Sequence, residues 1–178
     1  MATPTDEHKY LLTPGNLDTS KLTLEATAAG LLAAIPAAIL MIAAPVVRLP
    51  SVHLPALLAN VITGYWNPGV VTYGLGWLMY FVLAALSAIG YAWTVQRWHP
   101  RSGATMAALF SLVPWAVLQL FVLTRIGVGP GALSHTQWLG EATVTFAGFV
   151  VFGAVTGIVL RYAALATSMP IFEIRRRA

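Results

Sequence analysis

The sequence predicts an all-α integral membrane protein, a bundle of four membrane-spanning helices with a short interfacial or re-entrant helix after the first span. Of its 178 residues 58% are hydrophobic and only 9% are charged, whereas soluble domains carry about 25% charged residues. The mean hydropathy is +0.75. Four apolar stretches are long enough to cross about 30 Å of hydrocarbon. Once they are placed, no room is left for an additional soluble domain.

The first span is expected at residues 22–47, within a transmembrane domain of residues 21–167. Residues 1–20 are polar and are expected to form a cytoplasmic arm. They are not expected to be a signal peptide, because the acidic pair Asp6 and Glu7 stands where a signal peptide would be basic. Pro36 should bend the first span, since proline removes one backbone donor and crowds the preceding turn.

A shorter apolar segment follows at residues 51–64. It is too short to cross the membrane, and its apolar residues are spaced to share one helical face. These residues are Leu54, Leu57, Leu58, Val61 and Ile62. We therefore expect an interfacial or a re-entrant helix here.

Three further spans are expected at residues 70–95, 104–123 and 139–166. Pro114 should bend the third span. The segment GVGPG at 127–131 predicts a loop, because closely spaced glycine and proline disfavour helix.

Basic residues are distributed unequally between the two sides of the predicted bundle. One side has Lys9, Lys21, Arg97, Arg101, Arg161 and the Arg175, Arg176 and Arg177 run of the basic tail at residues 168–178. The other side has Arg48 and Arg125. The positive-inside rule then predicts a multi-pass protein of the cell (plasma or inner) membrane with both termini cytoplasmic. The same pattern favours contact with lipid headgroups over nucleic acid.

No pattern typical of catalysis or metal binding is present. The chain has no cysteine, which excludes thiolate metal sites and thiol nucleophiles. Phosphate-binding, dinucleotide and metalloprotease motifs are also missing. The histidines His8, His53, His99 and His135 all lie away from the middle of a span, so haem ligation of the paired-helix type is not expected. We predict no catalytic residues and no metal site.

The candidate polar site consists of Gln119, Arg125 and Glu141. Ionisable residues at membrane depth are costly and often functional. A local ion pair between Glu141 and Arg125 is one interpretation, and a proton-relay carboxylate at Glu141 is the other. Gln119 in the third span is expected to bond a neighbouring helix or a ligand.

Small residues form the strongest positive signal. Glycines allow helices to approach closely and to gain dispersion contacts in a membrane. The predicted packing residues are Gly74, Gly76, Gly148, Gly153 and Gly157. They would serve the internal packing of the bundle or docking onto a larger complex.

Three segments carry a resemblance to a known group of proteins. TAAGLLAAIPAAILM at 27–41, NPGVVTYGLGWL at 67–78 and FGAVTGIVL at 152–160 resemble helices of the YagU/YqhR-like small bacterial and archaeal membrane proteins. The histidine often found before the glycine pair in that group is lacking. The resemblance implies a four-helix membrane protein, with some relatives encoded beside terminal oxidase genes.

These features predict a non-catalytic accessory subunit of a larger membrane complex, such as a respiratory or photosynthetic electron-transfer assembly. Its partners would be other integral membrane subunits and membrane lipids. The alternative is a small transporter or a lipid- or quinone-binding protein with a cavity around Pro36, Pro114 and Gln119. No cofactor of its own is expected, and lipid, quinone or a peripheral pigment would be the bound molecules.

Overall fold

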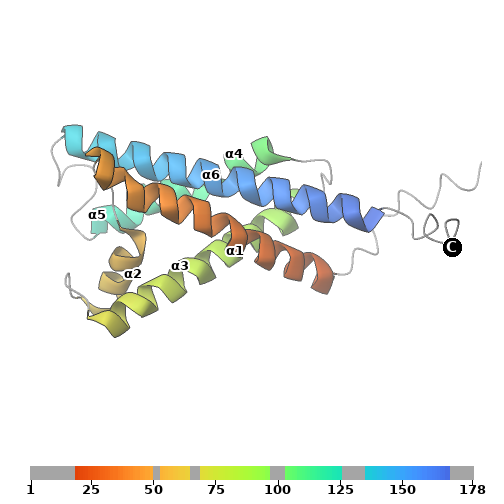
Figure 1. The fold of residues 1–178 in the computed structure, drawn as a ribbon, viewed down its shortest axis with the longest axis horizontal. Coiled ribbons are helices and arrows are strands. Elements are labelled where there is room, and N and C mark those ends of the chain that lie inside the picture. Colours follow the sequence, from red (N-terminus) through yellow and green to blue (C-terminus); the bar gives the residue numbers. More distant parts are fainter. Residues whose placement is uncertain (1–18, 50–52, 65–68, 97–102, 126–134, 169–178) are drawn as a thin grey trace, which may run out of the picture.

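The computed structural model describes residues 19–49, 53–64, 69–96, 103–125 and 135–168, and within these ranges it is helical with no strand (Figure 1). Four helical stretches are long and apolar enough to cross a membrane: Thr19–Val47, Val70–Val95, Ala104–Val122 and Gln137–Ala164. The all-α, four-span prediction is therefore confirmed. The arm before residue 19, the GVGPG loop and the basic tail after residue 168 lie outside the described residues.

Helix α1 (Thr19–Ala43) continues without a break through Pro36 into the short 3-10 helix η2 (Ala44–Val47). The first span ends at Arg48, whose backbone is left-handed with φ of 60°. The Arg48 N–H donates to the carbonyls of Ala44 and Pro45, so the end of the span is capped by its own backbone.

Helix α2 (Leu54–Thr63) packs into one end of the bundle against α3 (Val70–Tyr91). Leu54 and Leu57 are buried, as the predicted apolar face requires. Val61 does not share that environment, since 51% of it is exposed. The difference arises because the side of α2 that packs on α3 carries Pro55, whose carbonyl lies directly against Gly76. Val61 is not on that side.

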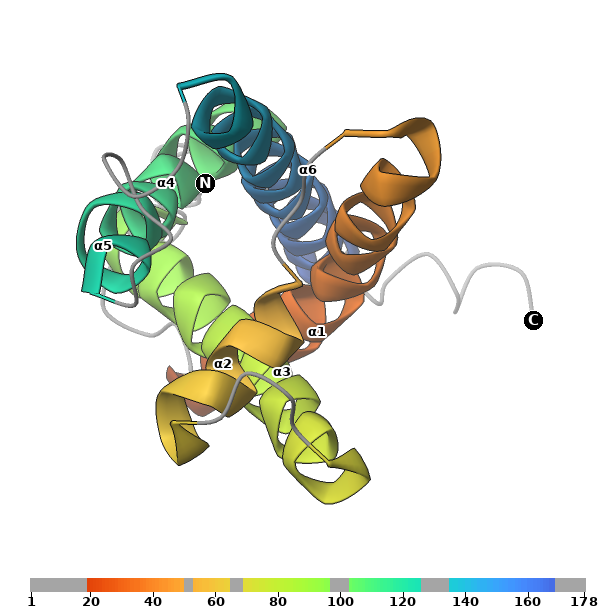
Figure 2. The same ribbon diagram turned by 90° about the vertical axis from the view of Figure 1, so that its left-hand side faces the viewer.

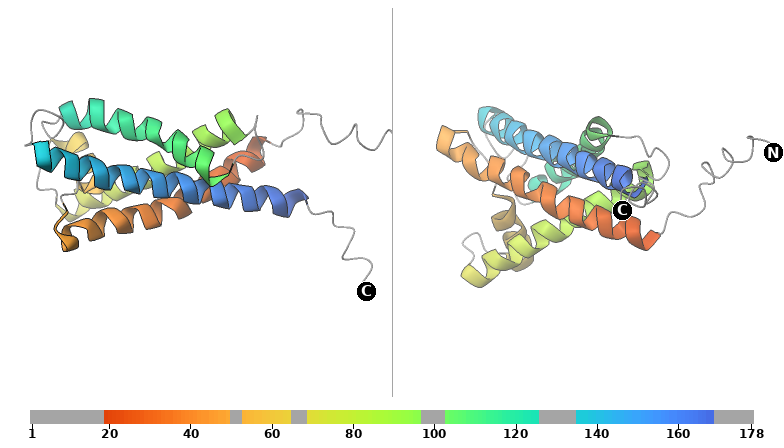
Figure 3. Two further views of the ribbon diagram at one scale, coloured as in Figure 1. Left: turned by 90° about the horizontal axis from the view of Figure 1, so that it is seen from above. Right: turned by 45° about the vertical axis from the view of Figure 1, so that its right-hand side comes forward.

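The long helices form two layers. Helix α6 (His135–Ser168) packs against both α1 and α4 (Ala104–Val117), and the three lie in a row (Figure 3). Helix α3 crosses α1 on the other side and ends in the π-helical turn η3 (Ala92–Gln96). Helix α4 continues into a second π-helical turn, η4 (Leu118–Val122), and then α5 (Leu123–Arg125).

Glycines lie where these helices come closest. A Cβ atom on Gly30 would be 2.8 Å from the Ala84 carbonyl oxygen of α3, and one on Gly157 would be 2.8 Å from the Cβ of Ala107 in α4. Gly153 lies directly against the Ala107 carbonyl. Side chains of any size at these glycines would force the helix pairs apart.

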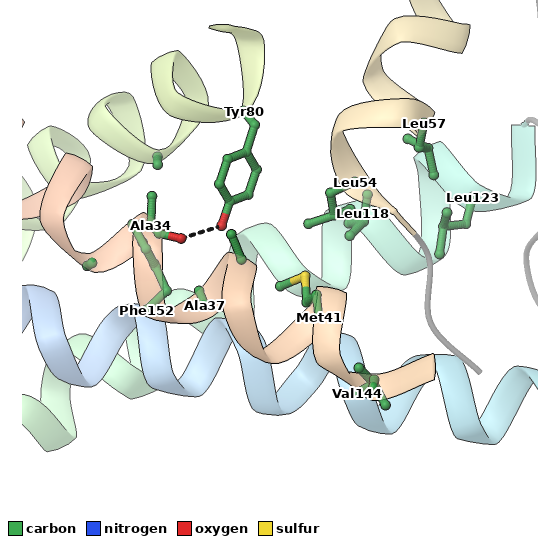
Figure 4. Packing of buried hydrophobic residues seen from close by; sticks show 14 residues of the cluster. Ala34, Ala37, Met41, Leu54, Leu57, Tyr80, Leu118, Leu123, Val144 and Phe152 are labelled. Carbon is green, nitrogen blue, oxygen red and sulfur yellow. Dashed lines mark hydrogen bonds between the residues drawn. The ribbon is translucent and has the colours of Figure 1, made fainter. Parts of the chain in front are cut away.

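Larger side chains fill the core at the end of the bundle where α2 lies. Figure 4 shows Leu54 and Leu57 of α2 beside Leu118 and Leu123, with Met41 of α1 close by. At the opposite end a second cluster of buried residues includes Leu22, Tyr91 and Leu160. Members of the first cluster, together with side chains of α3 and α4, also line a cavity.

Candidate functional site

Helices α3 and α4 meet at one end and diverge towards the other. The Phe110 ring lies 3.8 Å from the position of a Cβ on Gly90, and its centroid is 5.6 Å from that of Tyr91. From this contact α3 runs away from α4 towards α2 (Figure 2). Leu54 and Leu58 of α2 enter the space between the diverging helices. The result is a wedge, narrow at Phe110 and wide at α2.

The wedge encloses a cavity of about 570 Å³. Its inner wall is made of buried side chains from several helices, among them Met41, Leu118 and Phe152. Its outer rim is made of exposed side chains of the two diverging helices. The rim residues are Leu83 and Leu86 on α3, and Val113 and Val117 on α4. The cavity therefore opens sideways between two helices that are long and apolar enough to cross a membrane.

Very few polar groups line this cavity. The Tyr80 hydroxyl donates a hydrogen bond to the Ala34 carbonyl of α1 at 2.9 Å, which ties α3 to α1 across the inner wall (Figure 4). Ser87 supplies the other side-chain hydroxyl. Pro114 also lines the cavity, whereas Pro36 and Gln119, which were predicted to border one, are not among its lining residues.

Gln119 instead lies in the interface between η4 and α6. Only 3% of it is exposed, and its Nε2 donates to the Thr145 hydroxyl at 2.8 Å. The Trp115 indole N–H donates to the same hydroxyl at 3.3 Å, and Thr145 itself donates to the Glu141 carbonyl at 2.8 Å. Since the Thr145 proton is committed to that carbonyl, the hydroxyl can only accept from Gln119. Gln119 thus bonds to a neighbouring helix, which is one of the two roles expected for it.

Glu141 lies one helical turn before Thr145. It is half-buried, and its Oε2 atom is enclosed without a hydrogen-bond partner among the described residues, as is Oε1 of Gln119. The Arg125 side chain lies outside the described residues, so the Glu141–Arg125 ion pair stays a prediction. The structure thus places two members of the candidate polar site at one helix crossing, beside the cavity rather than inside it.

The glycines predicted to pack helices occupy different surroundings. Gly76 faces α2, Gly148 lies against the Met41 side chain of α1, and Gly153 and Gly157 face α4. Gly74 differs, because nothing lies within 4 Å of its Cβ position. Four of the five glycines therefore pack within the chain, and Gly74 is on an open surface of α3.

The described residues contain no group of three or more His, Asp or Glu side chains that could hold a metal ion. His53 is exposed at the start of α2. The side chain of His135, and all of His8 and His99, lie outside the described residues.

The hydroxyl groups that form hydrogen bonds between helices or line the cavity were not predicted from the sequence. Ser111 is buried, and its Oγ donates to the Phe149 carbonyl of α6 at 2.7 Å. Thr145, Tyr80 and Ser87 were likewise not singled out. Serine, threonine and tyrosine are neutral and common in membrane helices, so only their placement reveals a role.

No protein-family model, no curated protein and no solved structure matches this chain. The function of the chain is therefore inferred from its own residues, and the YagU/YqhR-like resemblance stays a prediction.

Proposed function

We propose that this chain is a membrane protein that binds an apolar chain, such as the acyl tail of a lipid or the prenyl tail of a quinone, in the cavity between α3 and α4. One observation carries this proposal: the 570 Å³ cavity has apolar walls and opens sideways between two helices apolar enough to cross a membrane. An apolar molecule dissolved in the membrane could enter without crossing a polar barrier.

The size of the cavity favours a chain over a protein helix. Pockets for small molecules typically measure about 300–1,000 Å³. The cavity narrows to the approach of Phe110 to Gly90, whereas a spanning helix is about 10 Å across along its whole length. A flexible chain fits this space and restores the dispersion contacts that the wall residues Met41, Leu118 and Phe152 lack towards the cavity.

Photolabelling would test the proposal directly. The protein would be reconstituted in lipid nanodiscs with a long-chain alkyl diazirine, illuminated and digested, and the labelled peptides identified by mass spectrometry. We expect label concentrated on cavity-lining residues of α3 and α4, and suppressed by an excess of unlabelled chain. Label spread evenly over all lipid-facing residues, with no suppression, would contradict specific binding.

A second candidate function is an accessory subunit of a larger complex, including an electron-transfer assembly. The observation that favours it is Gly74, which is open on the same side of α3 as the exposed Val70 and Val71. A small residue on an exposed helix face is a place where the backbone of another helix can approach. Purification from native membranes in mild detergent would test this role, since a monomer without co-migrating subunits would contradict it.

We also propose that both termini are cytoplasmic. Lys21 at the start of α1 and Arg161 near the end of α6 lie at one end of the bundle, and Arg48 lies at the other. Because the chain lacks cysteine, single cysteines placed at residues 5 and 175 could be labelled without background. In sealed native cells a membrane-impermeant thiol reagent should leave both cysteines unlabelled. Labelling of either cysteine would contradict the proposed orientation.

A further inference from the structure

The narrow end of the cavity has a backbone carbonyl without its helical donor. In an α-helix the carbonyl of one residue accepts from the N–H four residues later. Four residues after Phe110 stands Pro114, which has no N–H. Phe110 and Pro114 both line the cavity, which puts this carbonyl in the stretch of α4 that borders it. An acceptor without a donor in an apolar setting is costly unless another group satisfies it.

The register of α3 against α4 puts a hydroxyl-bearing residue at the level of this carbonyl. Phe110 touches α3 at Gly90, and the two helices run antiparallel, so one turn back from Gly90 brings Ser87 to the level of Pro114. Ser87 lines the cavity. Among the described residues its hydroxyl has no hydrogen-bond partner. By contrast, the helical hydroxyls of Thr94, Thr143, Thr145 and Thr156 each donate to a carbonyl four residues earlier.

The two groups together define what they would recognise. A carbonyl only accepts a hydrogen bond, whereas a serine hydroxyl both donates and accepts. A ligand hydroxyl satisfies both, because it donates to the Phe110 carbonyl and accepts from Ser87. An ether or ketone oxygen satisfies only Ser87, and a hydrocarbon satisfies neither.

We propose that the bound molecule is a hydroxyl-bearing apolar chain whose hydroxyl lies at the narrow end of the cavity, between Ser87 and the Phe110 carbonyl, with its chain extending towards α2. This inference rests on the proposed function and adds the headgroup class and its direction. A fatty alcohol, a diacylglycerol and a prenylated hydroquinone share this chemistry, and a fully oxidised quinone lacks the donor.

The test compares two probes of equal chain length, hexadecanol and hexadecane, as competitors of the photolabel in nanodiscs, with empty discs correcting for partition into lipid. Because the alcohol makes two hydrogen bonds of ordinary strength that the alkane cannot make, we expect it to compete about tenfold more strongly. Ser87→Ala should reduce this preference to about threefold, because only the hydrogen bond to the Phe110 carbonyl remains. Thr143→Ala, an exposed hydroxyl on α6, should retain the full preference.

A second variant keeps the test decisive if the Ser87→Ala protein does not fold. Pro114→Ala restores an N–H donor to the Phe110 carbonyl and should also lower the alcohol preference to about threefold. Equal competition by alcohol and alkane in the wild type, or a preference that survives both variants, would overturn the hydroxyl assignment while leaving chain binding intact. Failure of both probes to compete would instead overturn the proposed function.

Discussion

The two neighbours of α4 contact it in contrasting ways. Against α6 its surface is closed: Gly153 and Gly157 bring the backbones together at Ala107, and Ser111 donates across the interface to the Phe149 carbonyl. Against α3 the contact is confined to the region of Phe110, and the rest is a cavity. The same helix therefore forms one tight interface and one open interface.

The difference follows from side-chain size and polarity. The α6 side of α4 offers alanine and hydroxyl groups, which permit close approach and cross-helix hydrogen bonds. The side of α4 that faces α3 carries Phe110, Val113 and Val117. The facing side of α3 carries Leu83 and Leu86. These side chains do not fill the space between the two helices, because the four aliphatic ones lie exposed at its rim. The close contacts and cross-helix hydrogen bonds of α4 are thus with α6, and its open side faces α3.

The largest expected effect comes from breaking the closed interface. Gly153→Leu places a side chain against the Ala107 backbone, which has no room to yield. Overpacking of this kind costs about 1–3 kcal/mol or more. Thermal unfolding in detergent should show a clear loss of stability. Gly74→Leu, at the position with nothing within 4 Å, is the matched control and should be nearly neutral; equal losses for both variants would contradict the assigned packing.

An intermediate effect is expected from the polar contacts of the closed interface. Thr145→Val removes the oxygen that accepts from Gln119 and Trp115, and leaving buried donors unsatisfied costs about 1–3 kcal/mol. The midpoint of thermal unfolding should fall. Thr143→Val removes an exposed hydroxyl that bonds only within its own helix, so its midpoint should stay near that of wild type. A stable Thr145→Val protein would show that these contacts add little.

The smallest effect concerns the open side. Tyr80→Phe removes the hydrogen bond to the Ala34 carbonyl on the inner wall of the cavity, and one neutral hydrogen bond contributes about 0.5–1.5 kcal/mol. A small drop in unfolding temperature is expected. Tyr73→Phe on the same helix should cause none, and a larger drop there than at Tyr80 would argue against the α3–α1 tie.

The spans themselves could be predicted from the sequence because hydropathy and length decide them. The expected span 70–95 coincides with Val70–Val95, and the expected span 104–123 ends one residue from Val122. The π-helical turns at Ala92–Gln96 and Leu118–Val122 could not be predicted in this way, because a shift of one residue in the hydrogen-bond pattern leaves composition unchanged. The exposure of Val61 was missed because it depends on which side of α2 meets Gly76.

The candidate site was predictable only in part. Gln119 stands out in sequence as a polar residue in an apolar span, and the structure gives it a partner on α6. No single residue of the sequence predicts the cavity. It results from the angle between α3 and α4 and from the entry of α2 between them, both of which are set by contacts distant in sequence, such as Gly30 against Ala84.

The central claim is that the space between α3 and α4 holds an apolar chain, and native mass spectrometry of protein released from nanodiscs tests it most directly. Val113→Trp extends an indole ring from the rim of the cavity, where 60% of Val113 is exposed. Leu109→Trp is the matched control on α4, with 56% of Leu109 exposed and no part in the lining. Wild type and Leu109→Trp should each retain one bound chain, and Val113→Trp should lose it. Equal retention by all three proteins, or no bound chain in the wild type, would contradict the claim.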